Sequence, residues 1–149
     1  MRKINIAIIT GGIVAERGVS LKSAKTIYDN LNRNKYTPYL VDFDGNKFIE
    51  ISSKRKLSKV DFSFTKDGNK VKIDLAFLML HGSPAEDGKL QGYLEIIGIP
   101  YTGCDVFVSS LTFDKQSCKT FLKSYNIPMA DSQLLRKGEK VNVRRIEKM

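Results

Sequence analysis

The chain has 149 residues, of which 42% are hydrophobic and 28% charged, with 11 glycines and 4 prolines. This length gives room for one ordinary domain, or for one domain and the start of another. The composition excludes collagen, low-complexity disorder and small disulfide-stapled folds. The formal net charge of +9 by itself suggests an anionic partner such as nucleic acid, phospholipid or a nucleotide.

The surplus positive charge is concentrated at the end of the chain. Residues 136–149 hold six basic and two acidic side chains, a contribution of +4 that leaves +5 for the other 135 residues. No run of five or more like charges occurs, so the pattern is not typical of a nucleic-acid-binding tail. We interpret the excess as a solvated basic surface.

The two cysteines, Cys104 and Cys118, have no CxxC or Cys/His spacing around them, which indicates neither a zinc site nor a disulfide framework. We therefore expect a reduced, cytoplasmic compartment. The apolar residues 4–9 lead into Gly11-Gly12 without a small-residue cleavage site, so they predict a buried strand rather than a signal peptide. No other apolar run has the length of a membrane span.

The predicted elements begin with a strand, a glycine loop and a helix. After the strand at residues 4–9, apolar side chains recur at helical spacing, and Ser20 is placed to cap this helix. A second strand is predicted at residues 36–43. Residues 47–73 then alternate in short pieces, and the turn at residues 67–69 is typical of a hairpin. The apolar positions of the helix are Leu21, Ala24, Ile27, Tyr28 and Leu31.

Six uninterrupted apolar residues, 75–80, predict an interior strand of a parallel sheet with helices on both faces. A helix is predicted from Glu86, with two acids at its positive end, and residues 99–101 form a short extended piece. Two more helices are predicted, one over residues 105–111 and one capped by Asp114. The inner face of the last helix would hold Cys118, Phe121, Leu122 and Tyr125.

Strands that alternate with helices predict the α/β class, with a doubly wound, largely parallel sheet, an inserted β-hairpin and a helical start of the next domain. In such sheets, ligands bind beyond the carboxyl ends of the strands. Two loops leave such ends here, residues 11–20 and residues 81–88. Both carry polar side chains that a simple connection would not need, so both are candidate ligand-binding loops.

The first of these loops places paired glycines after a buried strand, where backbone amides can approach a phosphate or a carboxylate. Its spacing fits neither the dinucleotide-binding GxGxxG pattern nor the lysine-containing phosphate loop. Glu16 is an acid in a loop otherwise suited to anions. On spacing alone, Glu16 and Arg17 as ordinary solvated charges are the simpler interpretation.

The second loop holds the only histidine of the chain, His81, with Glu86 and Asp87 five and six residues later. An imidazole can exchange protons near neutral pH, or donate to a phosphate when charged. The simpler alternatives are a histidine that bonds only its own loop and two acids that interact with a helix dipole. A third candidate is Lys115, whose ammonium could reach a nucleotide phosphate, although an exposed lysine in a first helical turn is the ordinary alternative.

Four sequence blocks are spread along nearly the whole chain. They are Gly11-Gly12-x-x-Ala15-Glu16-Arg17-x-Val19-Ser20, residues 81–92, Ile99-Pro100-Tyr101-Thr102-Gly103, and Asp114-Lys115 followed by Lys119. In their order and spacing, these blocks resemble the D-alanine–D-alanine ligases of the ATP-grasp superfamily. The resemblance implies a Rossmann-like amino-terminal substrate-binding domain over residues 1–104. Over residues 105–149 it implies linker helices and the truncated start of the central ATP-grasp domain.

The resemblance implies an enzyme that uses ATP to phosphorylate the carboxylate of one D-alanine. The amine of a second D-alanine then attacks the acyl phosphate and gives the dipeptide used in peptidoglycan synthesis. Glu16 would contact the ammonium of the first D-alanine, and His81 would lie near its reacting carboxylate. Gly12 and Ser20 would bind the substrate, and Lys115 would contact the ATP phosphates, where positive charge stabilises the transferred group.

The resemblance also limits what this chain is expected to do alone. The Mg²⁺ ligands and the remaining ATP contacts of the family lie beyond the part matched here, so residues 1–149 are expected to hold no metal and to be inactive. Family members are often dimers through the amino-terminal region, so a homodimer is among the expected partners, with no nucleic acid and no membrane.

The sequence departs from the family pattern at two positions. Ala85 stands where glycine is usual, which predicts backbone strain if a positive φ is needed there. Gly18 stands where an acid is common, so a local charge contact is expected to be lost. Two alternatives remain open: an ATP-grasp ligase for another acid and amine, and a non-catalytic basic module that binds nucleic acid. The second has little support because aromatic and basic residues do not interleave.

Overall fold

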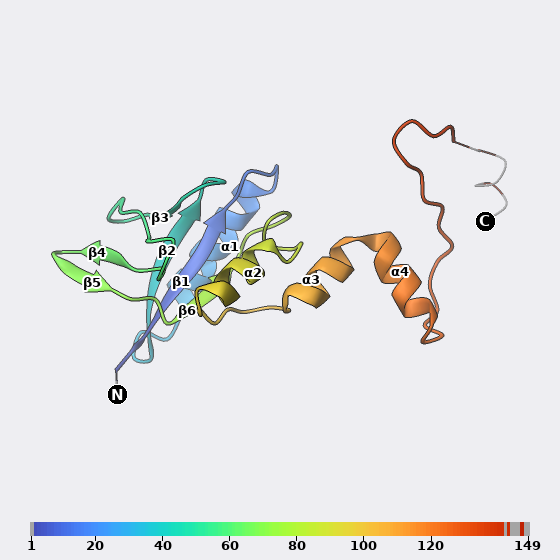
Figure 1. The fold of residues 1–149 in the computed structure, drawn as a ribbon. Helices are drawn as coiled ribbons and strands as arrows, with labels where there is room; N and C mark the ends of the chain where they lie inside the picture. The colour runs from blue at the N-terminus through green and yellow to red at the C-terminus, as the bar shows by residue number, and fades with distance from the viewer. Residues whose placement is uncertain (1, 142, 144–146, 148–149) are drawn as a thin grey trace.

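A four-stranded sheet forms the centre of the amino-terminal part of the molecule (Figure 1), with the strand order β3-β2-β1-β6. The central strand β1 (Ile4–Gly11) pairs in parallel with β2 (Tyr36–Phe43) on one side and with β6 (Leu75–Leu78) on the other. The described part of this computed structural model comprises residues 2–141, 143 and 147. The predicted α/β class with a largely parallel sheet is confirmed.

The two edges of the sheet are completed by short segments. β3 (Phe48–Glu50) pairs antiparallel with β2, and Tyr101 makes a parallel bridge to Ala76 of β6. β4 (Phe64–Lys66) and β5 (Asn69–Val71) form a separate antiparallel pair. These two strands are the predicted hairpin, because both turn residues between them have the positive φ of a tight type I′ turn, 49° and 77°.

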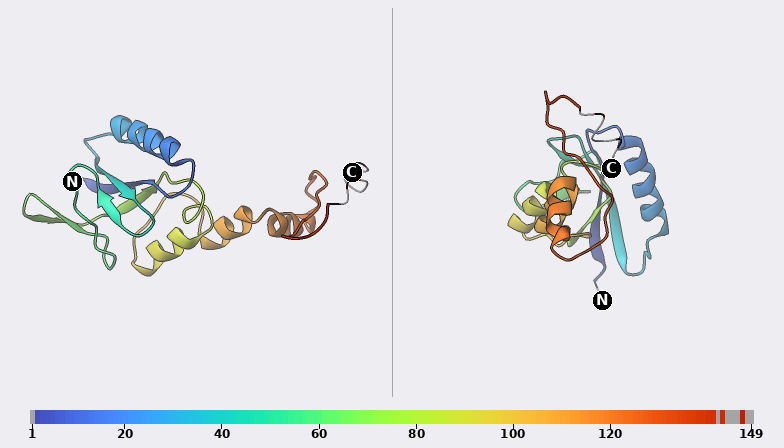
Figure 2. Two further views of the ribbon diagram at one scale, coloured as in Figure 1. Left: turned by 90° about the horizontal axis from the view of Figure 1, so that it is seen from above. Right: turned by 90° about the vertical axis from the view of Figure 1, so that its right-hand side faces the viewer.

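Different helices cover the two faces of the sheet (Figure 2). Successive side chains of a strand point to opposite faces, so β1, which is apolar throughout its middle, contributes to both cores. Ile6 and Ile8 pack with Ala24 of α1 (Arg17–Asn30). Ala7 and Ile9 belong to the larger core, which includes the buried leucines of α2 (Lys89–Ile96). The sheet is therefore doubly wound, as predicted.

The predicted start of α2 at Glu86 is wrong. The helix begins at Lys89, after Gly88, whose φ of +85° departs from the helical region. Glu86 and Asp87 therefore belong to the loop that follows β6, not to the first turn of a helix. The second candidate loop, residues 81–88, is therefore non-helical throughout and contains both acids as well as His81.

Two helices, α3 (Val106–Phe113) and α4 (Lys115–Lys123), lead away from the sheet (Figure 1). The predicted cap at Asp114 is confirmed, and Asp105, predicted only as the start of a helix, caps α3. The carboxylate of Asp105 accepts from the Val108 amide at 2.8 Å, and that of Asp114 accepts from the Ser117 amide at 2.6 Å. The predicted inner face of α4 is wrong because no residue of this helix is buried.

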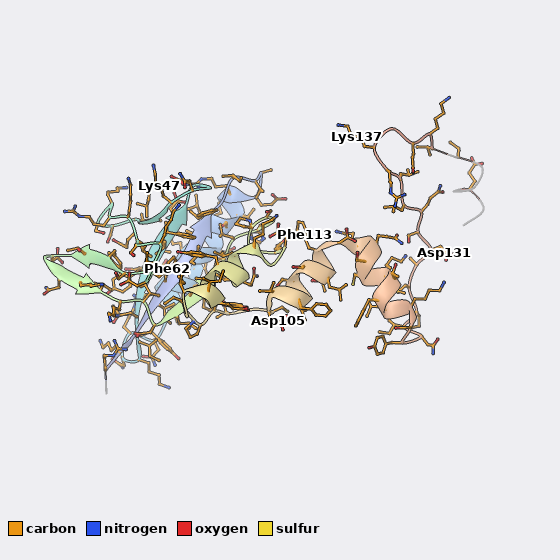
Figure 3. The ribbon with its side chains drawn as sticks, viewed as in Figure 1. Lys47, Phe62, Asp105, Phe113, Asp131 and Lys137 are labelled. Carbon is orange, nitrogen blue, oxygen red and sulfur yellow. The ribbon has the colours of Figure 1, made fainter. Side chains whose placement is uncertain are left out.

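An extended segment follows α4 and carries Asp131 and Lys137, both far from the sheet (Figure 3). Of the basic stretch predicted from residue 136 onward, Arg144, Arg145 and Lys148 lie outside the described residues. Within the described ranges, no helix has the length and apolar character needed to cross a membrane.

Candidate functional site

The first candidate loop begins with two glycines whose amides are both used inside the fold. Gly11 has a φ of +93° and its N–H donates to Ser20 Oγ at 3.0 Å, while Gly12, with a φ of +91°, donates to the Phe43 carbonyl at 2.8 Å. The expectation that these amides approach a ligand is therefore wrong, because their hydrogen bonds hold the loop itself. In the first turn of α1, the amides of Arg17 and Ser20 are also bonded to backbone carbonyls. Among the described residues, this leaves the amides of Gly18 and Val19 as donors for an anion.

Ser20 lies inside the protein rather than at the start of a helix. α1 begins three residues earlier with Glu16 as its N-cap, and no side chain caps it, so the predicted capping role of Ser20 is wrong. The Ser20 side chain is fully buried, donates to the Met79 carbonyl at 2.6 Å and lies 2.9 Å from Thr10 Oγ1. It thereby joins the carboxyl end of β1 to that of β6.

Glu16 lies at the exposed entrance to α1. Its backbone carbonyl accepts from the Ser20 amide at 3.0 Å, which fixes the backbone at this position. Its carboxylate makes no hydrogen bond or ion pair with another residue of the described ranges. An exposed carboxylate on a fixed backbone is suited to bind a cationic group of a small ligand.

The side chain of Arg17, the next residue, contacts both the backbone of the first loop and β2. Its Nη2 lies 2.8 Å from Asp42 Oδ2, and its Nη1 donates to the Gly12 carbonyl at 3.2 Å. The hydrogen bond that Arg17 donates to the Asp42 carboxylate raises the pKa of Arg17 above its ordinary value. The interpretation of Arg17 as an ordinary solvated charge is therefore wrong, since it makes two specific contacts.

The second candidate loop presents His81 beside an acid. His81 Nδ1 lies 3.9 Å from Glu86 Oε1, which is beyond hydrogen-bond distance but close enough for attraction when the imidazole is charged. Its Nε2 is buried without a partner among the described residues. The loop closes on itself, because the Gly82 carbonyl accepts from the amides of Ala85 and Glu86, each at 2.9 Å.

The expected strain at Ala85 is absent. The positive φ angles of this loop belong to Gly82, at +66°, and Gly88, at +85°, whereas Ala85 is not among the residues with positive φ. Its methyl group is buried, and its carbonyl accepts from Gln91 Nε2 at 2.6 Å. Alanine therefore fits the shape of this loop. Gly18, the other departure, is exposed and would place a Cβ in open space.

A cleft of about 450 Å³ lies between the second loop and the helices that follow it. Lys115 lines this cleft together with Glu86, so the structure brings the second and fourth sequence blocks together. Figure 3 labels Phe113, which also lines the cleft, at the end of α3. The remaining lining residues are Leu78, Leu80, Ala85, Gln91, Thr102, Gly103, Cys104, Ser109 and Thr112.

The first loop packs against the second, although Gly12, Glu16, Ser20 and His81 do not line the cleft. A Cβ on Gly12 would lie 3.2 Å from the side chain of Leu80, which does line it. A Cβ on Gly82 would lie 3.3 Å from Val14 of the first loop. The four blocks thus gather at the carboxyl ends of β1 and β6, where doubly wound sheets bind ligands.

Sequence reasoning missed two residues that shape these loops, Asp42 and Gln91. Asp42 lies opposite Thr10 in the register of β1 and β2, so an acid near the end of the neighbouring strand was the available signal. Gln91 is almost fully buried on α2 and bonds the second loop. Within the described ranges, no group of three or more His, Cys, Asp or Glu side chains could hold a metal ion.

The fold and the two loops define an α/β domain of the kind that binds small charged ligands beyond the ends of parallel strands. A family model described as "D-ala D-ala ligase N-terminus" matches residues 5–104. The chain belongs to this family.

Individual relatives are similar over most of the chain. The D-alanine–D-alanine ligase of Flavobacterium psychrophilum is 43% identical over 148 residues, which is 97% of this chain but 45% of that protein. The structure of the Coxiella burnetii D-alanine–D-alanine ligase matches 98% of this chain and 50% of its own, with a TM-score of 0.84 and 27% identity. The Bacillus anthracis ligase complexed with ATP matches 99% of this chain and 43% of its own, with a TM-score of 0.74 and 31% identity. The chain thus spans about half the length of these proteins or less.

Proposed function

We propose that this chain supplies the amino-terminal, substrate-binding part of an ATP-dependent ligase that joins two D-alanine molecules for peptidoglycan synthesis. The observation that carries the proposal is the gathering of four sequence blocks at one end of the sheet. The 43% identity to the D-alanine–D-alanine ligase of Flavobacterium psychrophilum supports it. Residues 1–104 would form the substrate-binding domain, and residues 105–149 would lead into the next domain. The ligase would act in the cytoplasm, with a homodimer as the expected assembly.

The reaction needs three kinds of polar contact from this chain. Glu16 would pair with the ammonium of the first D-alanine, since its carboxylate is exposed at the start of α1. His81 would lie near the carboxylate that accepts the phosphoryl group and, when protonated, would offset its negative charge. Lys115 would stabilise the phosphates of ATP from the wall of the cleft. The amine of the second D-alanine would then displace phosphate from the acyl phosphate.

Gly12 and Ser20 would contribute to the substrate site indirectly, by holding the backbone of the first loop in place. The Ser20 hydroxyl is buried and already bonded, and the Gly12 amide is bonded to Phe43. We propose that both residues set the shape of the loop that presents Glu16. The described residues do not fit a Mg²⁺ site, so Mg²⁺ takes no part in the steps assigned to this chain, and its expected ligands would belong to the rest of such a ligase.

A chimera tests the proposed function. In it, this chain replaces the matching part of the Flavobacterium psychrophilum ligase, and ADP release and dipeptide formation are measured with ATP, Mg²⁺ and D-alanine. We expect turnover that depends on D-alanine, and none from the 149-residue chain or from the remainder of the relative alone. A chimera that folds, judged by cooperative thermal unfolding, but does not turn over D-alanine would contradict the proposal.

Glu16→Gln in the same chimera tests the role of the carboxylate. Loss of a charged contact at a reacting centre should lower kcat/KM for D-alanine about a hundredfold, with unchanged thermal unfolding. Glu95→Gln is the matched control, because Glu95 is exposed on α2 and does not line the cleft. Equal kinetics for both variants would remove Glu16 from the site.

A further inference from the structure

Arg17 and Asp42 form an ion pair that bridges two elements over the glycine loop. Arg17 is the first residue of α1, and Asp42 lies near the end of β2, 25 residues further along the chain. One guanidinium nitrogen lies 2.8 Å from the carboxylate, and another donates to the Gly12 carbonyl at 3.2 Å. A single side chain thus joins the helix, the neighbouring strand and the loop backbone.

The backbone at Gly11 lies so close to this ion pair that it leaves no room for a side chain. A Cβ on Gly11 would lie 2.0 Å from Asp42 Oδ1 and 2.6 Å from Arg17 Nη1. Both distances are far below van der Waals contact, so any side chain at Gly11 would displace the ion pair. The parallel register of β1 and β2, which sets Thr10 beside Asp42, brings the carboxylate to this place.

The segment between Gly12 and Arg17 is consequently held at both of its ends. At one end, the Gly12 amide donates to Phe43 and its carbonyl accepts from Arg17. At the other, the Arg17 amide donates to the Val14 carbonyl at 3.1 Å, and its guanidinium is anchored by Asp42. Glu16 directly precedes this anchored arginine, so its position is tied to that of the ion pair.

We propose that Arg17 and Asp42 are positioning residues that hold Glu16 where it meets the first substrate, an inference that rests on the proposed function. The planar fork of a guanidinium can bond the carboxylate and the carbonyl at once, whereas the ammonium of lysine keeps the charge but lacks this fixed geometry. A misplacement of about 1 Å can lower a rate about a hundredfold. The ion pair therefore acts through Glu16 and does not itself touch the substrate.

The kinetic test compares Arg17→Lys with Arg2→Lys in the chimera. Arg2 is a matched control because it pairs with Asp74 at 2.6 Å near the start of β1, at the opposite end of the strand from the loop. We expect Arg17→Lys to lower kcat/KM for D-alanine about tenfold to a hundredfold, with KM for ATP unchanged and thermal midpoints similar in the two variants. An unchanged kcat/KM in Arg17→Lys, or an equal loss in Arg2→Lys, overturns the proposal.

A second measurement needs no activity and uses the 149-residue chain. Arg17→Lys and Asp42→Asn should both shift the backbone amide signals of residues 12–16 in ¹H–¹⁵N NMR spectra, and Arg2→Lys should leave them in place. Unshifted signals in either of the first two variants overturn the proposal even if the chimera is active. The signals could shift while the unsubstituted chimera folds but does not turn over D-alanine. That result would refute the proposed function alone, and the positioning of Glu16 by the ion pair would still be supported.

Discussion

The sheet with its covering helices, residues 2–104, and the arm formed by residues 105–141 differ in what they bury. All seventeen buried apolar side chains of the described residues lie between Ile6 and Leu94. The described residues also include sixteen large apolar side chains that are exposed, and ten of these belong to Phe107 or to residues after it. The sheet domain therefore contains its own hydrophobic core, whereas the arm has none.

The arm still forms helices for local reasons. Asp105 and Asp114 cap them, and one aromatic pair links them, with ring centroids of Phe107 and Phe121 at 6.4 Å. Such contacts define helical segments but remove little apolar surface from water. The free energy of unfolding of this chain therefore comes mainly from the sheet domain, and the arm contributes little to it.

The most direct test of this difference replaces one phenylalanine by alanine in each part. Phe62 is fully buried in the sheet domain (Figure 3), and Phe121 of the arm is 41% exposed. Phe62→Ala should lower the free energy of unfolding by about 3–5 kcal/mol, and Phe121→Ala by less than about 0.5 kcal/mol. Urea unfolding of the two variants checks this. Losses of similar size would show that the arm shares the core.

A buried carboxylate gives the sheet domain a pH dependence of its own. Glu50 is 3% exposed and accepts hydrogen bonds from the amides of Ser52 and Ser53, at 3.1 and 2.7 Å, and from both hydroxyls. Burial alone would raise the pKa of Glu50, but the bonds from Ser53 and Ser52 outweigh it and lower that pKa below its ordinary 4.5. Ionised Glu50 therefore stabilises the fold above this ordinary value.

Glu50→Gln should lower the free energy of unfolding by about 1–3 kcal/mol at neutral pH, because the amide replaces a charged acceptor. The difference should shrink as the pH falls below 4.5 and vanish once the pH passes through the lowered pKa of the folded protein. Urea unfolding across this range checks it. Asp131→Asn is the control, because Asp131 is exposed and its carboxylate makes no hydrogen bond or ion pair among the described residues. A difference that persists at the lowest pH would contradict an effect of ionisation.

A smaller effect is expected in the second loop. Ala85→Gly should lower the free energy of unfolding by about 0.5–1 kcal/mol, because glycine adds backbone freedom to the unfolded chain where no positive φ is needed. Gly18→Ala is the opposite control. Its Cβ would point into open space on α1, so it should raise stability by a similar amount. Thermal unfolding of both variants tests the pair, and a gain from Ala85→Gly would restore the case for strain.

The smallest expected effect on unfolding lies in the arm. Asp114→Ala removes the hydrogen bond that caps α4, so helical content measured by circular dichroism should fall. The midpoint of urea unfolding should stay unchanged, since α4 adds no buried residue to the core. A shifted midpoint would mean that the arm and the sheet domain unfold together.

Much of the fold could be predicted from the sequence because its signals are local. The apolar run of β1, the turn at Asp67 and Gly68, and the cap at Asp114 each indicate their structure within a few residues. The start of α2 was misplaced because the acids at Glu86 and Asp87 imitate a first turn, while the left-handed φ of Gly88 depends on the packing around it.

The candidate site was predicted in outline and missed in detail. The positions of the loops follow from the strand ends, but the use of the Gly11 and Gly12 amides depends on partners that are distant in the chain. Ser20 shows the same limit. Its position before a helical pattern is typical of a cap, yet its hydroxyl contacts Met79, 59 residues away. Roles set by tertiary contacts leave no trace in local spacing.

The buried hydroxyl of Ser20 couples the two candidate loops to each other. Because it accepts from Gly11 and donates to the carbonyl of Met79, a substitution that shifts one strand end is felt at the other. Changes in the loop with Glu16 and changes in the loop with His81 should therefore be epistatic, with the effect of each depending on the other.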